Sequence, residues 1–281
     1  MNATNNMFIN HIVLLHGWGC DSRIWQSMLP FFESYADTLT LNINDLIEAN
    51  ILSGTSSDKS LDPDDVRKLV DSIAQQLPEN ALVCGWSLGG MLAAQLAEHC
   101  PQKVLGLITL SSNAVFTQSE KLDDDSQASK WPEAMPLETF ETFFSLLKKN
   151  HKKALKRFSL LEVNGDENAK EQMLYLQEVA ADIHSDVLEA GLGFLANINN
   201  IATINKIACP ALYCFGCKDA LVPVSAAALF ETQINARSKI VCLDGRGHLL
   251  HYPNEILVEK IKVFFASFIF PKNDQYQGEK L

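Results

Sequence analysis

Short apolar runs, separated by segments with helical spacing, make up the first half of the chain. The runs predict strands at residues 12–15, 39–43, 81–85 and 104–110. Apolar residues at helical spacing predict helices at 62–77 and 90–99. Because most of the strand runs lack polar alternation, both faces of the sheet are expected to be covered. The alternation of strands and helices therefore predicts an α/β fold, with a mostly parallel central sheet and helices on both faces.

The middle of the chain has a different pattern, because it is charged and helical and no strand signal appears between about residues 119 and 200. Strand signals resume at 211–215 and 239–243, and a final helix is predicted at 254–268. We therefore expect an α/β core formed by residues 1–118 and 201–281, interrupted by a helical cap insert at 119–200.

Composition and charge exclude several classes of protein. Of the 281 residues, 47% are hydrophobic and 20% are charged, which excludes a disordered chain. No apolar run approaches the roughly 18 residues needed to cross a bilayer, so no membrane association is expected. The net charge of −11 makes nucleic acid an unfavourable partner.

The cysteines and the first residues of the chain indicate in which cellular compartment the protein is expected. The first residues lack the basic and apolar regions of a secretion signal. Seven cysteines are an odd number, which fits buried, reduced thiols in a cytoplasmic protein. The Cys214–Cys217 pair has no second pair or histidine pair at metal-ligand spacing, so no metal site is expected. A monomer without a cofactor is predicted.

The sequence Gly85-Trp86-Ser87-Leu88-Gly89 lies between a predicted strand and a predicted helix. G-x-S-x-G in this context is the pattern of a nucleophile elbow, in which a tight turn exposes the serine hydroxyl above the sheet. A serine hydroxyl needs a base to take its proton and an acid to orient that base. Ser87 therefore predicts an aspartate and a histidine later in the chain.

Asp219 and His248 meet this requirement, since each follows a predicted strand and ligand crevices form at the carboxyl ends of parallel strands. His251 is the nearest competitor for the base, but His248 has the glycine-flanked loop position. Asp244 is the alternative for the acid that orients the histidine, but it is more simply interpreted as a turn residue. We predict Ser87, His248 and Asp219 as a catalytic triad.

His16-Gly17-Trp18-Gly19 follows the first predicted strand and can be a plain turn at the strand's end. With the elbow downstream, the hypothesis is an oxyanion hole in which the backbone N–H groups of Trp18 and Leu88 face the developing negative charge.

In this order, the motifs resemble those of the α/β-hydrolase superfamily over about residues 11–268. Within it, the sequence is similar to the carboxylesterases of biotin synthesis, which hydrolyse the methyl ester of pimeloyl-[acyl-carrier protein]. The narrower resemblance rests on residues 16–19 and 85–90 and on three cap segments. Trp131-Pro132, residues 143–147 and residues 156–161 are similar to that family's W-P, F-x-x-x-L and E-R-F-L-x-L pattern.

The resemblance implies a serine carboxylesterase that forms an acyl-enzyme and takes its substrate from acyl-carrier protein. It also implies a substrate site lined by Trp18, Ser87, Leu88, His248, Phe143, Phe144, Ser145, Leu146 and Leu147. After the second strand most relatives carry a D-x-x-G-x-G-x-S turn, whereas this chain has Asn44-Asp45-Leu46-Ile47-Glu48-Ala49-Asn50. That departure bears on the identity of the substrate more than on the triad.

Residues 148–157 contain six basic residues and no acidic one, whereas the other 271 residues carry 17 basic and 34 acidic residues. An isolated charge run is often just a solvated helix face. Because these residues follow the segment expected to line the substrate site, we predict that they bind the acidic carrier protein: Lys148, Lys149, Lys152, Lys153, Lys156 and Arg157.

Other functions share the triad or the fold. A general short-chain carboxylesterase and a C–C bond hydrolase use the same three residues. A non-catalytic ligand-binding protein is disfavoured because all three are present.

Overall fold

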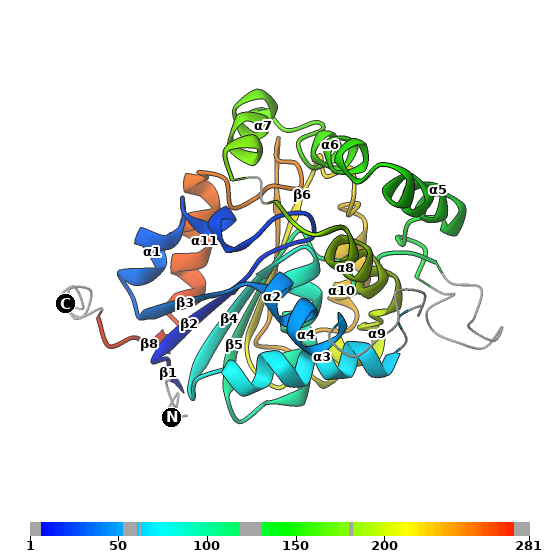
Figure 1. Cartoon of the computed structure of the whole chain (residues 1–281). Coiled ribbons are helices and arrows are strands. Elements are labelled where there is room, and N and C mark those ends of the chain that lie inside the picture. Colours follow the sequence, from blue (N-terminus) through cyan, green and yellow to red (C-terminus); the bar gives the residue numbers. More distant parts are fainter. Residues whose placement is uncertain (1–6, 53–60, 62, 119–130, 180–181, 273–281) are drawn as a thin grey trace.

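The computed structural model describes residues 7–52, 61, 63–118, 131–179 and 182–272 (Figure 1). Six parallel strands form its central sheet, in the spatial order β3-β2-β4-β5-β6-β7. The strands are β2 (His11–Leu15), β3 (Asp37–Leu41), β4 (Ala81–Trp86), β5 (Val104–Leu110), β6 (Ala211–Gly216) and β7 (Lys239–Leu243). The predicted parallel α/β fold is confirmed, with β3 beginning and ending two residues earlier than expected.

Helices cover both faces of the sheet because successive residues of a strand point to opposite sides. Val83 of β4 packs into one apolar core and its neighbour Cys84 into the other. The apolar core on the side of the sheet that Val83 faces includes residues from α2 (Ile43–Asn50), α3 (Pro63–Gln76), α4 (Leu88–His99), α9 (Ile201–Lys206) and α10 (Ala226–Glu231). The opposite core includes the short 3-10 helix η1 (Ser22–Trp25), α1 (Leu29–Glu33) and α11 (Glu255–Phe265).

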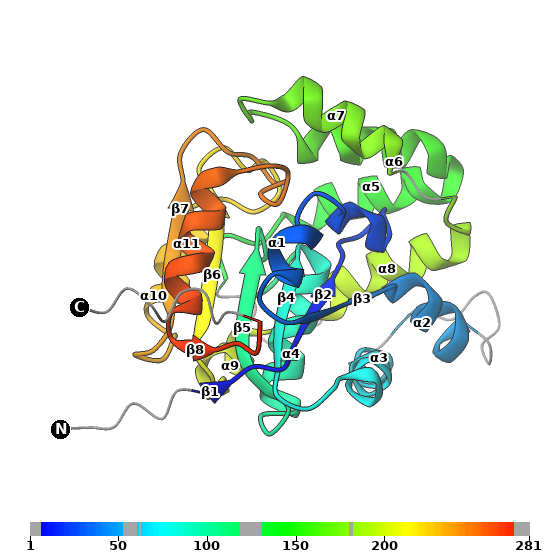
Figure 2. The same ribbon diagram turned by 90° about the vertical axis from the view of Figure 1, so that its left-hand side faces the viewer.

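The chain between β5 and β6 is helical where the structure describes it. It forms α5 (Leu137–Lys149), α6 (His151–Glu162), α7 (Ala169–Glu178) and α8 (Ser185–Asn197), and its pairings are isolated bridges at Thr117–Met135 and Val115–Asn199. Both views place α5, α6 and α7 beyond the carboxyl ends of the strands (Figures 1 and 2). We call α5–α8 the cap and propose the predicted boundaries for it; residues 119–130 and 180–181 lie outside the described part.

Two regions differ from the sequence-based expectations. Residues 44–50, read as a departure from a family turn, form most of helix α2, because Ile43, Leu46 and Ile47 bury one helical face. A small parallel sheet of β1 (Met7–Phe8) and β8 (Phe268–Ile269) was not predicted, since two residues per strand leave no periodic signal. The predicted start of α3 at residue 62 lies outside the described residues.

The burial of the cysteines also differs in part from the prediction. Five of the seven are buried and all seven are free, but Cys217 is half-buried and Cys242 is exposed. The expectation of burial is wrong for Cys242 because β7 is the edge strand, so part of its surface faces solvent. None of the helices in the described residues combines the length and the apolar character that a membrane span requires.

Candidate active site

Ser87 lies between β4 and α4 in a strained backbone conformation, with φ 54° and ψ −120°. A non-glycine residue rarely adopts a positive φ, and the strain persists only when its surroundings fix the conformation. Here the Ser87 N–H donates to the Leu110 carbonyl at 2.9 Å, and the Ser87 carbonyl accepts from the Ser112 hydroxyl at 2.9 Å. The end of β5 therefore holds the turn on both sides of the serine.

Glycines flank this turn because the strand and the helix cross without room for a side chain. A Cβ on Gly85 would lie 2.2 Å from the Gly89 carbonyl oxygen, and one on Gly89 would lie 2.3 Å from the Leu15 carbonyl oxygen. The G-x-S-x-G pattern thus reflects the close packing of α4 on β2 and β4.

The structure brings the three predicted triad side chains into one hydrogen-bonded chain. His248 Nε2 lies 3.0 Å from Ser87 Oγ, and His248 Nδ1 lies 2.8 Å from Asp219 Oδ2. The other Asp219 oxygen accepts the N–H groups of Leu221 and Val222 at 2.8 and 2.9 Å. With the proton on Nδ1, the imidazole has its Nε2 lone pair free to accept the serine proton.

The alternative acid and base occupy other environments. Asp244 is exposed on the surface. His251 is fully buried against the rings of Trp25 and Trp86, whose centroids each lie 4.7 Å from its own. Burial, together with the charge of His248, lowers the pKa of His251 to about 3, so this imidazole stays neutral.

A carboxyl that sequence reasoning missed, Glu162 at the end of α6, is buried near the triad. Burial raises the pKa of Glu162 to about 7, while His248 lowers it and Asp219 raises it. For His248, burial lowers the pKa, but the charge and hydrogen bond of Asp219 and the charge of Glu162 outweigh it and leave the pKa raised. A carboxyl directly after the mainly apolar stretch Phe158–Leu161 was the available sequence signal.

The Gly17–Trp18 peptide lies beside the serine, since a Cβ on Gly17 would be 3.2 Å from Ser87 Cβ. The Ile43 N–H donates to His16 Nε2 at 2.9 Å, so the His16 proton resides on Nδ1, which donates to the Gly17 carbonyl at 2.7 Å. In a trans peptide the Trp18 N–H points opposite to that carbonyl. Neither this N–H nor that of Leu88 donates a hydrogen bond within the described part of the chain.

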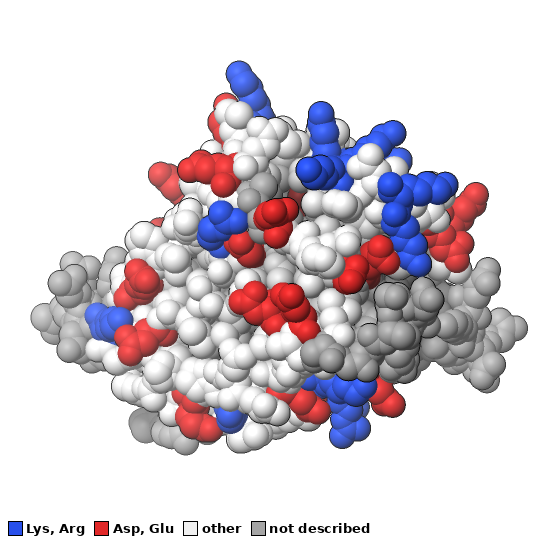
Figure 3. Space-filling model, viewed as in Figure 1, with Lys and Arg blue, Asp and Glu red and all other residues white. Residues whose placement is uncertain are grey.

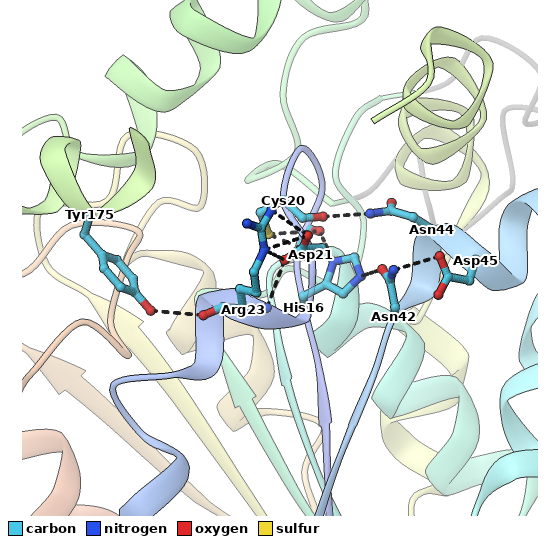
Figure 4. A network of polar contacts seen from close by, with 9 residues as sticks. His16, Cys20, Asp21, Arg23, Asn42, Asn44, Asp45 and Tyr175 are labelled. Atoms are coloured by element: carbon cyan, nitrogen blue, oxygen red, sulfur yellow. Dashed lines mark hydrogen bonds and ion pairs between the residues drawn. The ribbon is translucent and has the colours of Figure 1, made fainter. Parts of the chain in front are cut away.

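The start of α2 bonds to the loop at residues 16–20, which contains the Gly17–Trp18 peptide, as Figure 4 shows. Asn44 donates to the Cys20 carbonyl at 2.9 Å, and the Ile43 N–H, at the first residue of α2, donates to His16 Nε2 at 2.9 Å. Asn42, which precedes α2, donates to Asp45 at 2.8 Å. The segment that departs from the family turn therefore anchors the loop at residues 16–20 here.

The cap covers the site, and Ser87 is only 5% exposed. The Trp18 indole packs edge-on against Phe143 of α5 and Phe158 of α6, with centroid distances of 5.8 and 4.8 Å, and donates to the Leu188 carbonyl of α8 at 2.8 Å. Three cap helices therefore hold one side chain of the predicted oxyanion loop.

The rest of the predicted substrate segment lies on different sides of α5. Phe144 stacks on Phe140 at 6.1 Å, Leu147 is buried, Leu146 is partly buried and Ser145 is exposed. Their contact with a substrate stays a prediction. The six basic residues predicted to bind a carrier are all exposed, on the last turn of α5 and along α6. Blue side chains gather over these two helices in Figure 3.

The model of the alpha/beta hydrolase family matches residues 12–259. This chain belongs to the alpha/beta hydrolase family. The family prediction made from the motifs is thereby confirmed. This α/β hydrolase is also 32% identical over 257 residues to the "Biotin biosynthesis bifunctional protein BioHC" of Cellvibrio japonicus, covering 91% of the chain and 47% of that relative. The chain spans about half the length of such bifunctional relatives.

Shorter relatives match over most of their length. The "Pimeloyl-[acyl-carrier protein] methyl ester esterase" of Proteus mirabilis is 30% identical over 227 residues, which are 79% of this hydrolase and 80% of the relative. Among solved structures, an esterase from Exiguobacterium antarcticum superposes with a TM-score of 0.74 at 19% identity, covering 92% of each chain. A bromoperoxidase from Bacillus anthracis superposes with a TM-score of 0.73 at 19% identity, covering 93% of each chain. These structures show the shared fold.

The strain at Ser87 predicts an unusual order of stabilities. Ser87→Gly and Ser87→Ala both remove the hydroxyl, but only glycine adopts this backbone conformation freely, so the Gly variant should be more stable by about 1 kcal/mol. Urea unfolding of the two variants measures the difference. At Ser72, which is half-buried within α3, the order should reverse, with Ala about 1 kcal/mol more stable than Gly. A Ser87→Ala variant at least as stable as Ser87→Gly would contradict the strain at Ser87.

Glu162 predicts a pH-dependent stability. Its carboxyl binds the proton more tightly in the folded protein than in the unfolded chain, so its stabilising contribution is complete below the ordinary pKa of 4.5 and is lost as the pH rises through about 7. Glu162→Gln keeps the neutral shape at every pH. The variant should therefore gain stability relative to the native protein between pH 5 and pH 8, by roughly 3 kcal/mol at most. Denaturant unfolding at both pH values tests this, and a constant difference would contradict it.

Proposed function

We propose that this α/β hydrolase is a serine carboxylesterase that converts the methyl ester of pimeloyl-[acyl-carrier protein] to methanol and the free pimeloyl-[acyl-carrier protein] in biotin biosynthesis. The hydrogen-bonded chain from Ser87 through His248 to Asp219 is the observation that carries the reaction type. Family membership supports ester hydrolysis, and the names of the relatives support the carrier-bound methyl ester.

In the acylation step, Ser87 Oγ attacks the ester carbonyl carbon while its proton moves to His248 Nε2. Asp219 accepts from Nδ1 and stabilises the imidazolium that forms. The carbonyl oxygen of the ester gains negative charge, which the N–H groups of Trp18 and Leu88 stabilise. The tetrahedral intermediate collapses, the bond to the methoxy oxygen breaks, and the proton on Nε2 passes to that oxygen, so methanol leaves.

In the deacylation step, His248 Nε2 takes a proton from water, and the resulting nucleophile attacks the acyl-serine carbonyl. Collapse of the second intermediate returns the proton to Ser87 Oγ and releases the carboxylic acid. The sum is one ester and one water converted to one acid and one methanol. No cofactor enters either step.

The acyl chain lies against the segment of α5 that follows Pro136 in this proposal. Trp18 follows Gly17, which lies beside Ser87, and its ring contacts that of Phe143, so the two rings offer apolar surface that suits a chain of methylene groups. Phe144, Ser145, Leu146 and Leu147 complete the predicted lining. Because Ser87 is covered, the cap must admit the substrate through a narrow entrance or by a shift of its helices.

The outer face of α6 is proposed as the docking surface for the acidic carrier protein. Lys152, Lys153, Lys156 and Arg157 share this exposed face, and the opposite face of the helix buries Phe158 against Trp18. Together with Lys148 and Lys149, these residues form the docking patch. None of the six forms an ion pair with another residue of the described chain. A basic patch raises the rate of encounter with an acidic partner and makes it salt-dependent.

The triad is tested by removing one member at a time. Ser87→Ala should lower ester hydrolysis by about 10⁴- to 10⁶-fold, and Asp219→Asn should lower it severely because it favours the wrong imidazole tautomer. Hydrolysis of p-nitrophenyl esters and of a methyl ester on acyl-carrier protein provides the measurement, with Ser72→Ala as the control. A fluorophosphonate should label Ser87 in the native protein.

The outcome separates the alternatives. More than about a tenth of native turnover in Ser87→Ala would reject the nucleophile. High turnover of short p-nitrophenyl esters with none on the carrier-bound ester would indicate a general short-chain esterase. A native protein that binds esters without turning them over would be a ligand-binding protein, and cleavage of β-diketones instead of esters would indicate a C–C bond hydrolase.

The docking patch is tested by charge reversal. Changing Lys153, Lys156 and Arg157 to Glu should raise KM for the carrier-bound ester by about tenfold or more at low salt, because the surface then repels the acidic partner. Turnover of a small p-nitrophenyl ester should stay within about twofold, since that substrate needs no docking. The matched control reverses two exposed lysines and one exposed arginine outside the cap: Lys239, Lys260 and Arg67. Equal losses on both substrates would indicate a damaged cap and contradict docking at this face.

A further inference from the structure

The loop that carries His248 is bonded to the cap as well as to the core. We call residues 244–248 the histidine loop and residues 162–168, which connect α6 to α7, the cap corner. The Glu162 carbonyl accepts the His248 N–H at 3.2 Å, and the Glu167 N–H donates to the Gly245 carbonyl at 3.1 Å. The two segments therefore run against each other, although about 80 residues separate them in the sequence.

Asp166 makes the shortest of these contacts. Its Oδ2 accepts the Gly247 N–H at 2.7 Å and lies 3.7 Å from Nε of Arg246, while its Oδ1 accepts the Asn168 N–H at 2.8 Å. The Asp166 side chain has no exposed surface, and that of Arg246 is 9% exposed. A buried carboxylate with a charged partner forms short, directional hydrogen bonds, so this contact resists displacement.

These contacts fix the backbone on the amino-terminal side of the catalytic imidazole. The N–H groups of Gly247 and His248 are consecutive, and both bond to the cap corner. On the other side of the loop, the Arg246 carbonyl accepts the N–H of Lys218, the neighbour of Asp219, at 2.8 Å. Asp166 therefore holds one side of a loop whose other side bonds to the segment carrying the acid.

We propose that Asp166 is a positioning residue, whose carboxylate holds the histidine loop so that the His248 imidazole lies between Ser87 and Asp219. The inference rests on the proposed function, in which His248 is the base. Asp166 touches no reacting atom and acts through Gly247. A displacement of about 1 Å in a catalytic group can lower a rate by about 100-fold, so loss of this hydrogen bond should reduce kcat.

The test compares Asp166→Ala and the nearly isosteric Asp166→Asn with the native protein. Asparagine has one acceptor oxygen and cannot accept both the Gly247 and the Asn168 N–H. Both variants should lower kcat for a small p-nitrophenyl ester by about 10- to 100-fold and change KM by less than about threefold, because the binding surface is untouched. Glu171→Ala, which removes an exposed carboxylate on α7, is the matched control and should match the native protein.

Two further measurements distinguish positioning from a purely structural role. Titration of active sites with a fluorophosphonate gives kcat per folded molecule, and the low-field proton resonance of His248 Nδ1–H reports its bond to Asp219. In the folded variants this resonance should shift or broaden. Native kcat per titrated site with an unchanged resonance in Asp166→Asn would overturn the inference, even if Asp166→Ala does not fold. A native protein inactive on all esters would instead reject the proposed function.

Discussion

The crossing of α4 over β4 is the constraint on which the site depends. The chain must reverse direction at Ser87 within a space that admits no side chain at residues 85 and 89. The strained backbone at Ser87 is the result, and hydrogen bonds from the end of β5 hold it in place. Because the sheet is parallel, the loops that follow β2, β6 and β7 meet at this same edge. The loop at residues 16–20, Asp219 and His248 can thus converge on one serine.

Three buried carboxyls surround His248, and their hydrogen-bond partners differ. Asp219 accepts two backbone N–H groups as well as the imidazole, and Asp166 accepts two N–H groups beside a guanidinium. For Glu162, burial outweighs the charge of His248 and the hydrogen bond of the Ser159 hydroxyl, so its pKa is raised to about 7.

Local patterns account for what the sequence predicts well. β4, α4 and the intervening serine turn follow from apolar runs and two glycines, and the triad partners follow from strand ends and chain order. Helix α2 was missed because its role appears only in three dimensions, where the side chains of Ile43 and Ile47 pack into the core while the Ile43 N–H and the Asn44 amide bond to the loop at residues 16–20. Asp166 and Glu162 were missed for the same reason, because their partners lie some 80 residues away. Periodicity and motif spacing carry no signal for such contacts.

The bonds between the cap corner and the histidine loop limit how this fold can be recombined. A chimera that replaces the whole cap from a donor with a different corner would leave the N–H groups of Gly247 and His248 without their acceptors. A graft that retains residues 162–168 and exchanges only α5, the rest of α6 and α8 would preserve them. The cap of this hydrolase is therefore best treated as two modules: an outer part that can be exchanged and a corner that belongs, in function, to the core.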